Sequence, residues 1–76
     1  MTQNEQILEH IRERGSITPL EALKEYGIMR LASRVCDLKR QGYEIERTIE
    51  TANNRYGEPV RYARYSLREA ANETRH

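Results

Sequence analysis

The apolar residues of the segment 26–45 place the strongest constraint on how this chain can fold. Leu31, Val35 and Leu38 are spaced by four and then three residues, which places them on one face of an α-helix. Gly42 can adopt the left-handed conformation that commonly ends a helix. Directly after it the pattern changes to the alternation of a β-strand. The segment therefore predicts a helix packed on a core, a sharp stop and a strand.

Two further helix starts precede this segment. In each, a threonine is followed three residues later by a glutamate: Thr2 with Glu5, and Thr18 with Glu21. This spacing is typical of a capping box, in which hydroxyl and carboxylate satisfy free backbone N–H groups at the helix start. The expected helices and their buried residues are 3–14 with Ile7, Leu8 and Ile11, and 19–25 with Leu20, Leu23 and Tyr26. Only one or two residues are expected between the second helix and the third.

A β-hairpin is expected after the third helix. Apolar and polar residues alternate over 43–50, as in a strand with one covered face, and the partner strand is expected over 60–67. Turn-forming residues between them predict a loop over 51–59. Opposite charges should help to fix the register, at about 0.2–1 kcal/mol for each pair. The residues concerned are Glu44, Glu46 and Glu50 on the first strand and Arg61, Arg64 and Arg68 on the second. Residues 16–17 could add a short third strand.

Length and composition argue against an enzyme. The chain has 76 residues, so it forms one domain with a small core. Fourteen Ile, Leu and Val residues and five Tyr leave little room for a deep ligand cavity beside that core. His10 lies between two glutamates and is expected at the surface, while Cys36 resembles a small core residue. We expect no catalytic residue, no metal site and no cofactor.

Three features of the sequence predict the cellular compartment of the protein. No apolar run approaches the roughly 20 residues that cross a bilayer. The first residues lack the basic and then apolar pattern of a secretory signal, and a single cysteine forms no intramolecular disulfide. We therefore expect a cytoplasmic protein without a membrane segment.

Positive charge gathers in two blocks, although the net charge is only +1. Residues 28–42 and residues 51–68 each carry four basic groups and one acidic group, whereas residues 1–27 carry three basic and five acidic groups. The third helix and the second half of the hairpin could thus present one basic face to phosphates.

The solvent side of the third helix is the first candidate site. A helical wheel gathers there Arg30, Ser33, Arg34, Asp37, Arg40 and Gln41. Arginine can pair with guanine and aspartate can accept from cytosine, so this face has the chemistry to read bases. The alternative is a solvated helix face in which Asp37 braces Arg34 and Arg40.

The hairpin tip is the second candidate site. It holds Asn53, Asn54, Arg55 and Tyr56, and an arginine on a projecting loop suits the minor groove or nearby phosphates. The alternative is an ordinary polar turn.

Residues 5–67 resemble a small winged helix-turn-helix domain of the kind common in phage and prophage genomes. The resemblance rests on the segments SITPLEAL, YGIMRLASRVCDLKRQGYEI and NRYGEPVRYARYSL. It implies an α+β fold of three helices followed by a two-stranded β-hairpin wing. We expect the domain to span residues 1–68 and the polar residues 69–76 to form a C-terminal tail. It also implies DNA contacts from Arg30, Ser33 and Arg34 in the third helix and from Asn54 and Arg55 in the wing. Ser33 stands where many helix-turn-helix motifs have an aliphatic residue, which suggests a slightly longer turn or a shifted third helix.

Three functions are in competition. The leading hypothesis is sequence-specific binding of double-stranded DNA by a small regulator. The second is a protein-binding module that docks on a host or phage protein, favoured by the low net charge and by tyrosines on the hairpin (Tyr56, Tyr62 and Tyr65). The third is binding of single-stranded nucleic acid by stacking on those tyrosines. The operator, the sign of regulation and the oligomeric state stay open, since no heptad repeat or large apolar patch is visible in the sequence.

Overall fold

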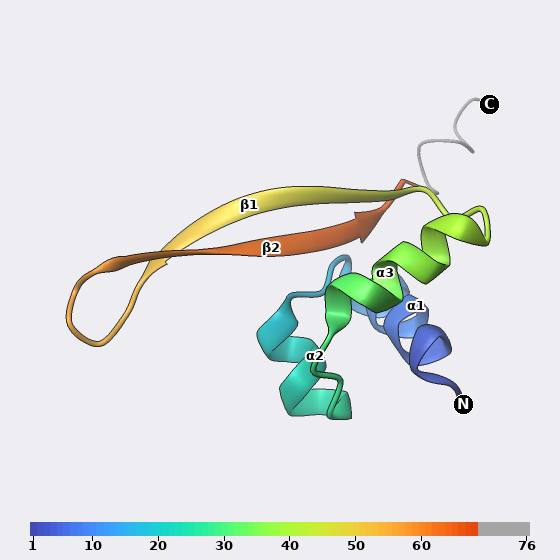
Figure 1. The fold of residues 1–76 in the computed structure, drawn as a ribbon, viewed down its shortest axis with the longest axis horizontal. Helices are drawn as coiled ribbons and strands as arrows, with labels where there is room; N and C mark the ends of the chain where they lie inside the picture. Colours follow the sequence, from blue (N-terminus) through green and yellow to red (C-terminus); the bar gives the residue numbers. More distant parts are fainter. Residues whose placement is uncertain (69–76) are drawn as a thin grey trace.

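The computed structural model describes residues 1–68, and the predicted tail over 69–76 lies outside them. Its elements are α1 (Gln3–Arg14), α2 (Pro19–Tyr26), α3 (Leu31–Arg40), β1 (Ile45–Asn53) and β2 (Pro59–Leu67). The helices gather into one body, and the antiparallel hairpin crosses that body and then projects beyond it (Figure 1). The expected fold of three helices and a two-stranded hairpin is confirmed.

Both predicted capping boxes are present. At the start of α2 the Thr18 N–H donates to Glu21 Oε1 at 3.0 Å, and the Glu21 N–H donates to Thr18 Oγ1 at 3.2 Å. The reciprocal pair at the start of α1 joins Thr2 and Glu5. These local bonds explain why both helix starts could be predicted to the residue.

The connection between α2 and α3 is longer than predicted. It comprises the four residues 27–30, because Gly27 takes a left-handed conformation with φ 70° and the chain then closes a second hydrogen bond. The Ile28 N–H donates to the Ala22 carbonyl, six residues earlier, at 3.1 Å, and the Ile28 side chain is buried in the core. The third helix therefore begins at Leu31, which agrees with the longer turn that Ser33 suggested.

The core lies between the three helices and the near half of the hairpin. Its buried apolar residues are Ile7, Leu8, Ile11, Ile17, Ala22, Ile28, Leu31, Val35, Leu38, Ile45 and Tyr65. The apolar stripes predicted for α1 and α3 are confirmed.

The prediction that α2 buries Leu20 and Leu23 is wrong. Their side chains are 64% and 46% exposed, and the core instead receives Ala22 and part of Tyr26. Both sets fit one side of an eight-residue helix, because residues three or four apart share a face. The sequence pattern alone could not choose between them.

His10 is also placed differently from the prediction. It is 3% exposed rather than at the surface, and its Nδ1 shares a hydrogen bond of 2.8 Å with the Tyr26 hydroxyl. Its Nε2 lies 3.6 Å from a carboxylate oxygen of Glu21. Burial raises the pKa of Tyr26. His10 thus joins α1 to both ends of α2.

The hairpin is longer and its loop shorter than predicted. The strands pair from Ile45 opposite Leu67 out to Asn53 opposite Pro59, and the connecting loop is only residues 54–58. The expected bridge at residues 16–17 is present, since the Ile17 and Tyr65 backbones exchange two hydrogen bonds of 2.9 Å. Nearer the tip the ribbon has no cover, since every residue from 51 to 61 is exposed.

Candidate nucleic-acid interface

The outer face of α3 carries most of the predicted site. Leu31, Val35 and Leu38 point into the core, so the residues between them are turned outward. Ser33, Arg34, Asp37 and Arg40 follow one another along a shallow surface depression of about 400 Å³. The structure therefore brings these four predicted site residues together on one face.

Asp37 sits at the centre of this face and holds two arginines. One of its carboxylate oxygens is 3.1 Å from Arg34 Nη2, and the other is 3.6 Å from Arg40 Nη1. The bracing arrangement that the sequence offered as the alternative is thus the observed geometry. It leaves the three side chains with a joint charge of +1 and draws both guanidinium groups toward the Asp37 carboxylate.

Arg30 differs from the other arginines of this region. It occupies the N-cap position of α3 without a side-chain cap bond, and within residues 1–68 it forms no ion pair. A second depression of about 510 Å³ joins Arg30 to Ser33 and Arg34 across the turn before the helix. Among the three predicted arginines at α3, Arg30 is thus the one without an ion pair within residues 1–68, and it lies at the amino end of the helix.

The prediction that Cys36 is a small core residue is wrong. Its side chain is exposed, and together with Ala32 it lines the same depression as Ser33 and Asp37. The signal was present in the spacing, since Cys36 is three residues after Ser33 and four before Arg40. Ala32 and Cys36 therefore supply the apolar part of the α3 face.

The hairpin tip is built around the side chain of Asn54. Its Oδ1 accepts from the N–H groups of Tyr56 at 2.9 Å and Glu58 at 3.0 Å, while its amide nitrogen donates to the Glu58 carboxylate. Asn54 therefore shapes the turn, and Arg55 is the tip residue whose charge is presented outward. The Arg55 guanidinium carbon lies 6.0 Å from the centre of the Tyr56 ring.

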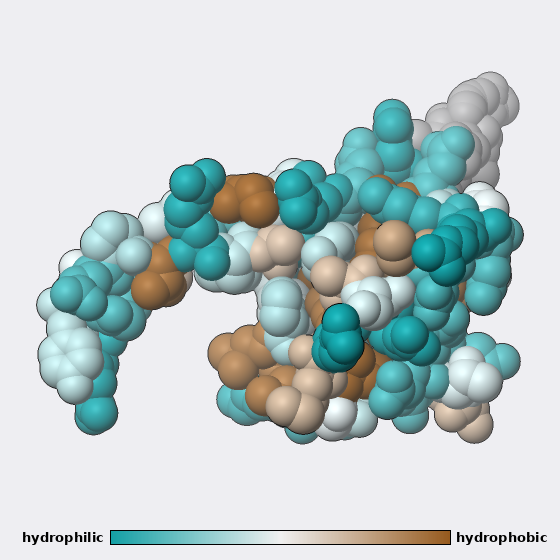
Figure 2. Space-filling model, in the orientation of Figure 1, coloured by the Kyte–Doolittle hydropathy of each residue, from teal (hydrophilic) through white to brown (hydrophobic). Residues whose placement is uncertain are grey.

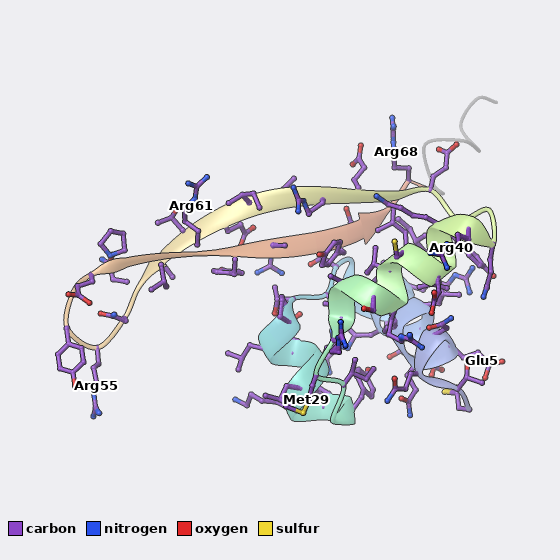
Figure 3. The ribbon with its side chains drawn as sticks, in the orientation of Figure 1. Glu5, Met29, Arg40, Arg55, Arg61 and Arg68 are labelled. Atoms are coloured by element: carbon purple, nitrogen blue, oxygen red, sulfur yellow. The ribbon has the colours of Figure 1, made fainter. Side chains whose placement is uncertain are left out.

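The two candidate sites lie far apart. Figure 3 shows Arg55 at the far end of the hairpin and Arg40 on α3 at the opposite side of the molecule. The structure does not bring the tip and the carboxyl end of α3 into one cluster, so a ligand that touches both must extend from the helical body to the end of the hairpin.

Cross-strand ion pairs neutralise part of the positive charge of the hairpin. Arg64 Nε is 2.8 Å from Glu50, and Arg68 Nε is 3.0 Å from Glu46, so two of the predicted pairs are confirmed. Both pairs are diagonal, because the register sets Glu50 opposite Tyr62 and Glu46 opposite Ser66. Hydrogen bonds from Tyr62 and Arg64 lower the pKa of Glu50.

Arg61 is the exception among the predicted ion pairs. It stands opposite Thr51 rather than an acidic residue, and it has no ion pair in the described part of the chain. The expectation that all three strand arginines meet carboxylates is therefore wrong for this one.

Metal-binding clusters and membrane-spanning helices are both absent from residues 1–68. No group of three or more His, Cys, Asp or Glu side chains is placed to hold a metal ion there. Within the same range, no helix combines the length and the apolar character that crossing a membrane requires.

The comparisons with known proteins agree with this architecture. Searches of curated proteins and of solved structures found no match. A family model described as a winged helix-turn-helix domain matches residues 2–70, which is most of the chain. Three helices, a turn of four residues before α3 and a projecting hairpin are the parts that such a domain requires. The chain therefore belongs to the winged helix-turn-helix family of DNA-binding domains.

Proposed function

We propose that this domain binds double-stranded DNA with sequence selectivity, as a small regulator of the phage or prophage type. In this proposal α3 enters the major groove, and the hairpin acts as a wing on the minor groove or the backbone. The observation that carries it is the outward polar face of α3, from Ser33 to Arg40, set over a fully buried apolar stripe. The phage setting depends on the sequence resemblance alone.

The contacts on α3 divide into two roles. Arg30 has no ion pair and no cap bond, so its guanidinium is available for a bidentate pair with guanine or for a phosphate. Asp37 pairs with Arg34 at 3.1 Å, which lowers the entropy cost of placing that guanidinium group in a groove, while Arg40 at 3.6 Å is held less closely. The Asp37 carboxylate also repels phosphates, so a poorly fitting duplex is penalised.

The wing makes a separate contact in this proposal. The longest extent of the molecule is 46 Å, which exceeds the roughly 34–36 Å of one turn of B-DNA. With Arg55 at the tip, α3 and the wing can thus reach different grooves of one duplex. Asn54 contributes to this contact through the turn that it holds, since its side-chain amide is engaged there.

The test compares base-reading residues with a phosphate contact. Arg30→Ala or Arg34→Ala should cost about 1–3 kcal/mol on a preferred site selected from random duplexes, and should relax selectivity. Arg55→Ala should weaken preferred and random duplexes to a similar extent. Binding is measured by fluorescence anisotropy with excess nonspecific competitor.

Lys24→Ala is the matched control for this test. It also removes one exposed basic charge, but from α2 and away from both candidate sites, so it should leave binding unchanged. Equal binding by the wild type and by folded Arg30 and Arg34 variants would rule out the assignment of α3 as the reading helix.

The structure gives less support to the two competing functions, binding of single-stranded nucleic acid and docking on a protein. Tyr65 is buried in the core and Tyr62 is half-buried with its hydroxyl bonded to Glu50, so Tyr56 is the one fully exposed ring of the three. A single exposed ring offers little for stacking on single-stranded nucleic acid. The protein-binding alternative, docking on a host or phage protein, keeps one supporting observation, the exposed leucines of α2.

A further inference from the structure

The depression beside Arg30 is shared by three separate segments of the chain. Its volume is about 510 Å³. We call it the Arg30 depression and define it by the residues that line it, which are Gln3, Gly27, Met29, Arg30, Ser33 and Arg34. Gln3 comes from α1, and the other residues come from α3 and from the turn before it. The polar face of α3 therefore continues onto the first turn of α1.

The lining of the Arg30 depression is positive. It contains two arginines and no acidic residue. Arg34 is partly neutralised by Asp37, whose carboxylate lies 3.1 Å away, whereas Arg30 forms no ion pair within residues 1–68. Figure 2 shows the setting: hydrophilic side chains gather over α3, while apolar side chains gather over α2. A surface with this charge attracts an anion.

Gln3 brings a free side-chain amide to this positive surface. The residue is exposed, and its side chain forms no hydrogen bond within the part of the chain that the structure describes. The cap of α1 is formed by Thr2 and Glu5 instead. Because a glutamine amide can donate two hydrogen bonds, the Gln3 side chain is available to an anion in the depression.

The place of α1 beside α3 decides which part of a duplex Gln3 can meet. The major groove of B-DNA is about 12 Å wide and a helix with its side chains is about 10–12 Å across, so α3 alone fills the groove. α1 packs directly against α3, and the axes of packed helices lie about 8–10 Å apart. A side chain from α1 therefore meets the wall of the groove, which is sugar and phosphate, rather than the base edges.

We propose that Gln3 donates its side-chain amide to a backbone phosphate of the duplex, at the groove wall beside Arg30. The inference rests on the proposed DNA-binding function and adds α1 to the elements that touch DNA. A phosphate contact fixes the position of a protein on the duplex without carrying sequence information. Gln3 thus sets where the amino end of α3 enters the groove, while Arg30 and Arg34 read the bases.

The first experiment changes the side chain at position 3 and measures binding by fluorescence anisotropy. Gln3→Lys places a cation at the phosphate, so it should strengthen binding and steepen the slope of log K against log salt by about 0.9. Glu13→Gln is the matched control, since it raises the charge of the chain equally and on the same helix, but outside the depression. It should leave the slope unchanged. Gln3→Ala should weaken preferred and random duplexes alike, by about five- to tenfold.

The second experiment locates the phosphate. Each phosphate of the preferred duplex is replaced in turn by a neutral methylphosphonate. At one position the replacement should weaken wild-type binding at least about fivefold more than it weakens binding by Gln3→Ala, because the variant has already lost the contact.

Three results would overturn the Gln3 contact alone. They are a salt slope for Gln3→Lys no steeper than that for Glu13→Gln, losses that simply add at every phosphate, and relaxed base selectivity in Gln3→Ala, which would make Gln3 a base reader. In each case a loss of affinity in Arg30→Ala would still support DNA binding by α3. A wild type that binds no duplex would instead overturn the DNA-binding proposal itself, and the Gln3 contact with it.

Discussion

At the scale of single residues, the two leucines Leu38 and Leu23 allow a direct test of the packing. Leu38, on the inner face of α3, is fully buried, whereas Leu23 on α2 is 46% exposed. Leu38→Ala should lower the free energy of unfolding by about 2–5 kcal/mol, because it loses transfer energy and leaves a cavity. Leu23→Ala should change it by no more than about 0.5 kcal/mol. Urea unfolding at low protein concentration measures both. If the two variants lost similar stability, α2 would be turned toward the core as the sequence pattern first predicted.

The same residues show how far the sequence could specify the core and the site. Three apolar residues over ten positions fix the inner stripe of α3, and with it the outward direction of Ser33 and Asp37. The eight residues of α2 carry two equivalent stripes, so its buried face depends on packing. The polarity of His10 predicts a surface position, but the residue is buried because its ring bonds to the hydroxyl of Tyr26, 16 residues away. No local pattern contains that partner.

At the scale of the secondary-structure elements, the cross-strand pair of Glu50 and Arg64 should make hairpin stability depend on pH. The pKa of Glu50 is held below its ordinary value of 4.5, because its carboxylate accepts hydrogen bonds from Tyr62 and Arg64. The stabilisation is therefore fully present above that value and is lost as pH falls through the lowered pKa. Glu50→Gln should weaken the hairpin near neutral pH, and wild type and variant should converge in acid.

Hydrogen exchange of the hairpin amides, followed against pH, measures this convergence. Glu44→Gln is the control, since Glu44 is exposed just before β1 and its side chain has no ion pair within the described residues. A difference between the wild type and Glu50→Gln that stays constant down to low pH would show that the charge of Glu50 does not stabilise the hairpin.

The extent of the hairpin was the least predictable part of the fold. Turn-forming residues correctly predicted where the chain reverses, but pairing continues through Thr51 and Ala52 until Asn54 closes the loop with its own side chain. Strand ends depend on such tertiary and side-chain bonds rather than on residue type alone. The same length carries the paired ribbon beyond the helical body, further than the predicted strands 43–50 and 60–67 would extend it (Figure 1).

At the scale of the whole molecule, the arrangement of charge matters more than its sum. A net charge of +1 would predict weak attraction to DNA. The structure, however, ties Arg64 and Arg68 into ion pairs within the hairpin and leaves Arg30 and Arg55 without one in the described chain. The cations available to phosphates therefore lie on α3, at the hairpin tip and, with the unpaired Arg61, along β2, while the α1–α2 side is net acidic.

This arrangement predicts a moderate dependence of DNA binding on salt. The cations concerned are Arg30, Arg34, Arg40 and Arg55. If each neutralises one phosphate, log K for one chain should fall against log salt with a slope of about −3.6, from roughly 0.9 counterions released for each phosphate. Arg55→Ala should reduce the magnitude of the slope by about 0.9 without changing the preferred sequence, because a phosphate contact carries no base information. Lys24→Ala should leave the slope unchanged, since Lys24 lies on the net acidic α1–α2 side. Anisotropy titrations at several salt concentrations measure all three slopes, and a flat dependence for the wild type would contradict DNA binding and favour docking on a protein.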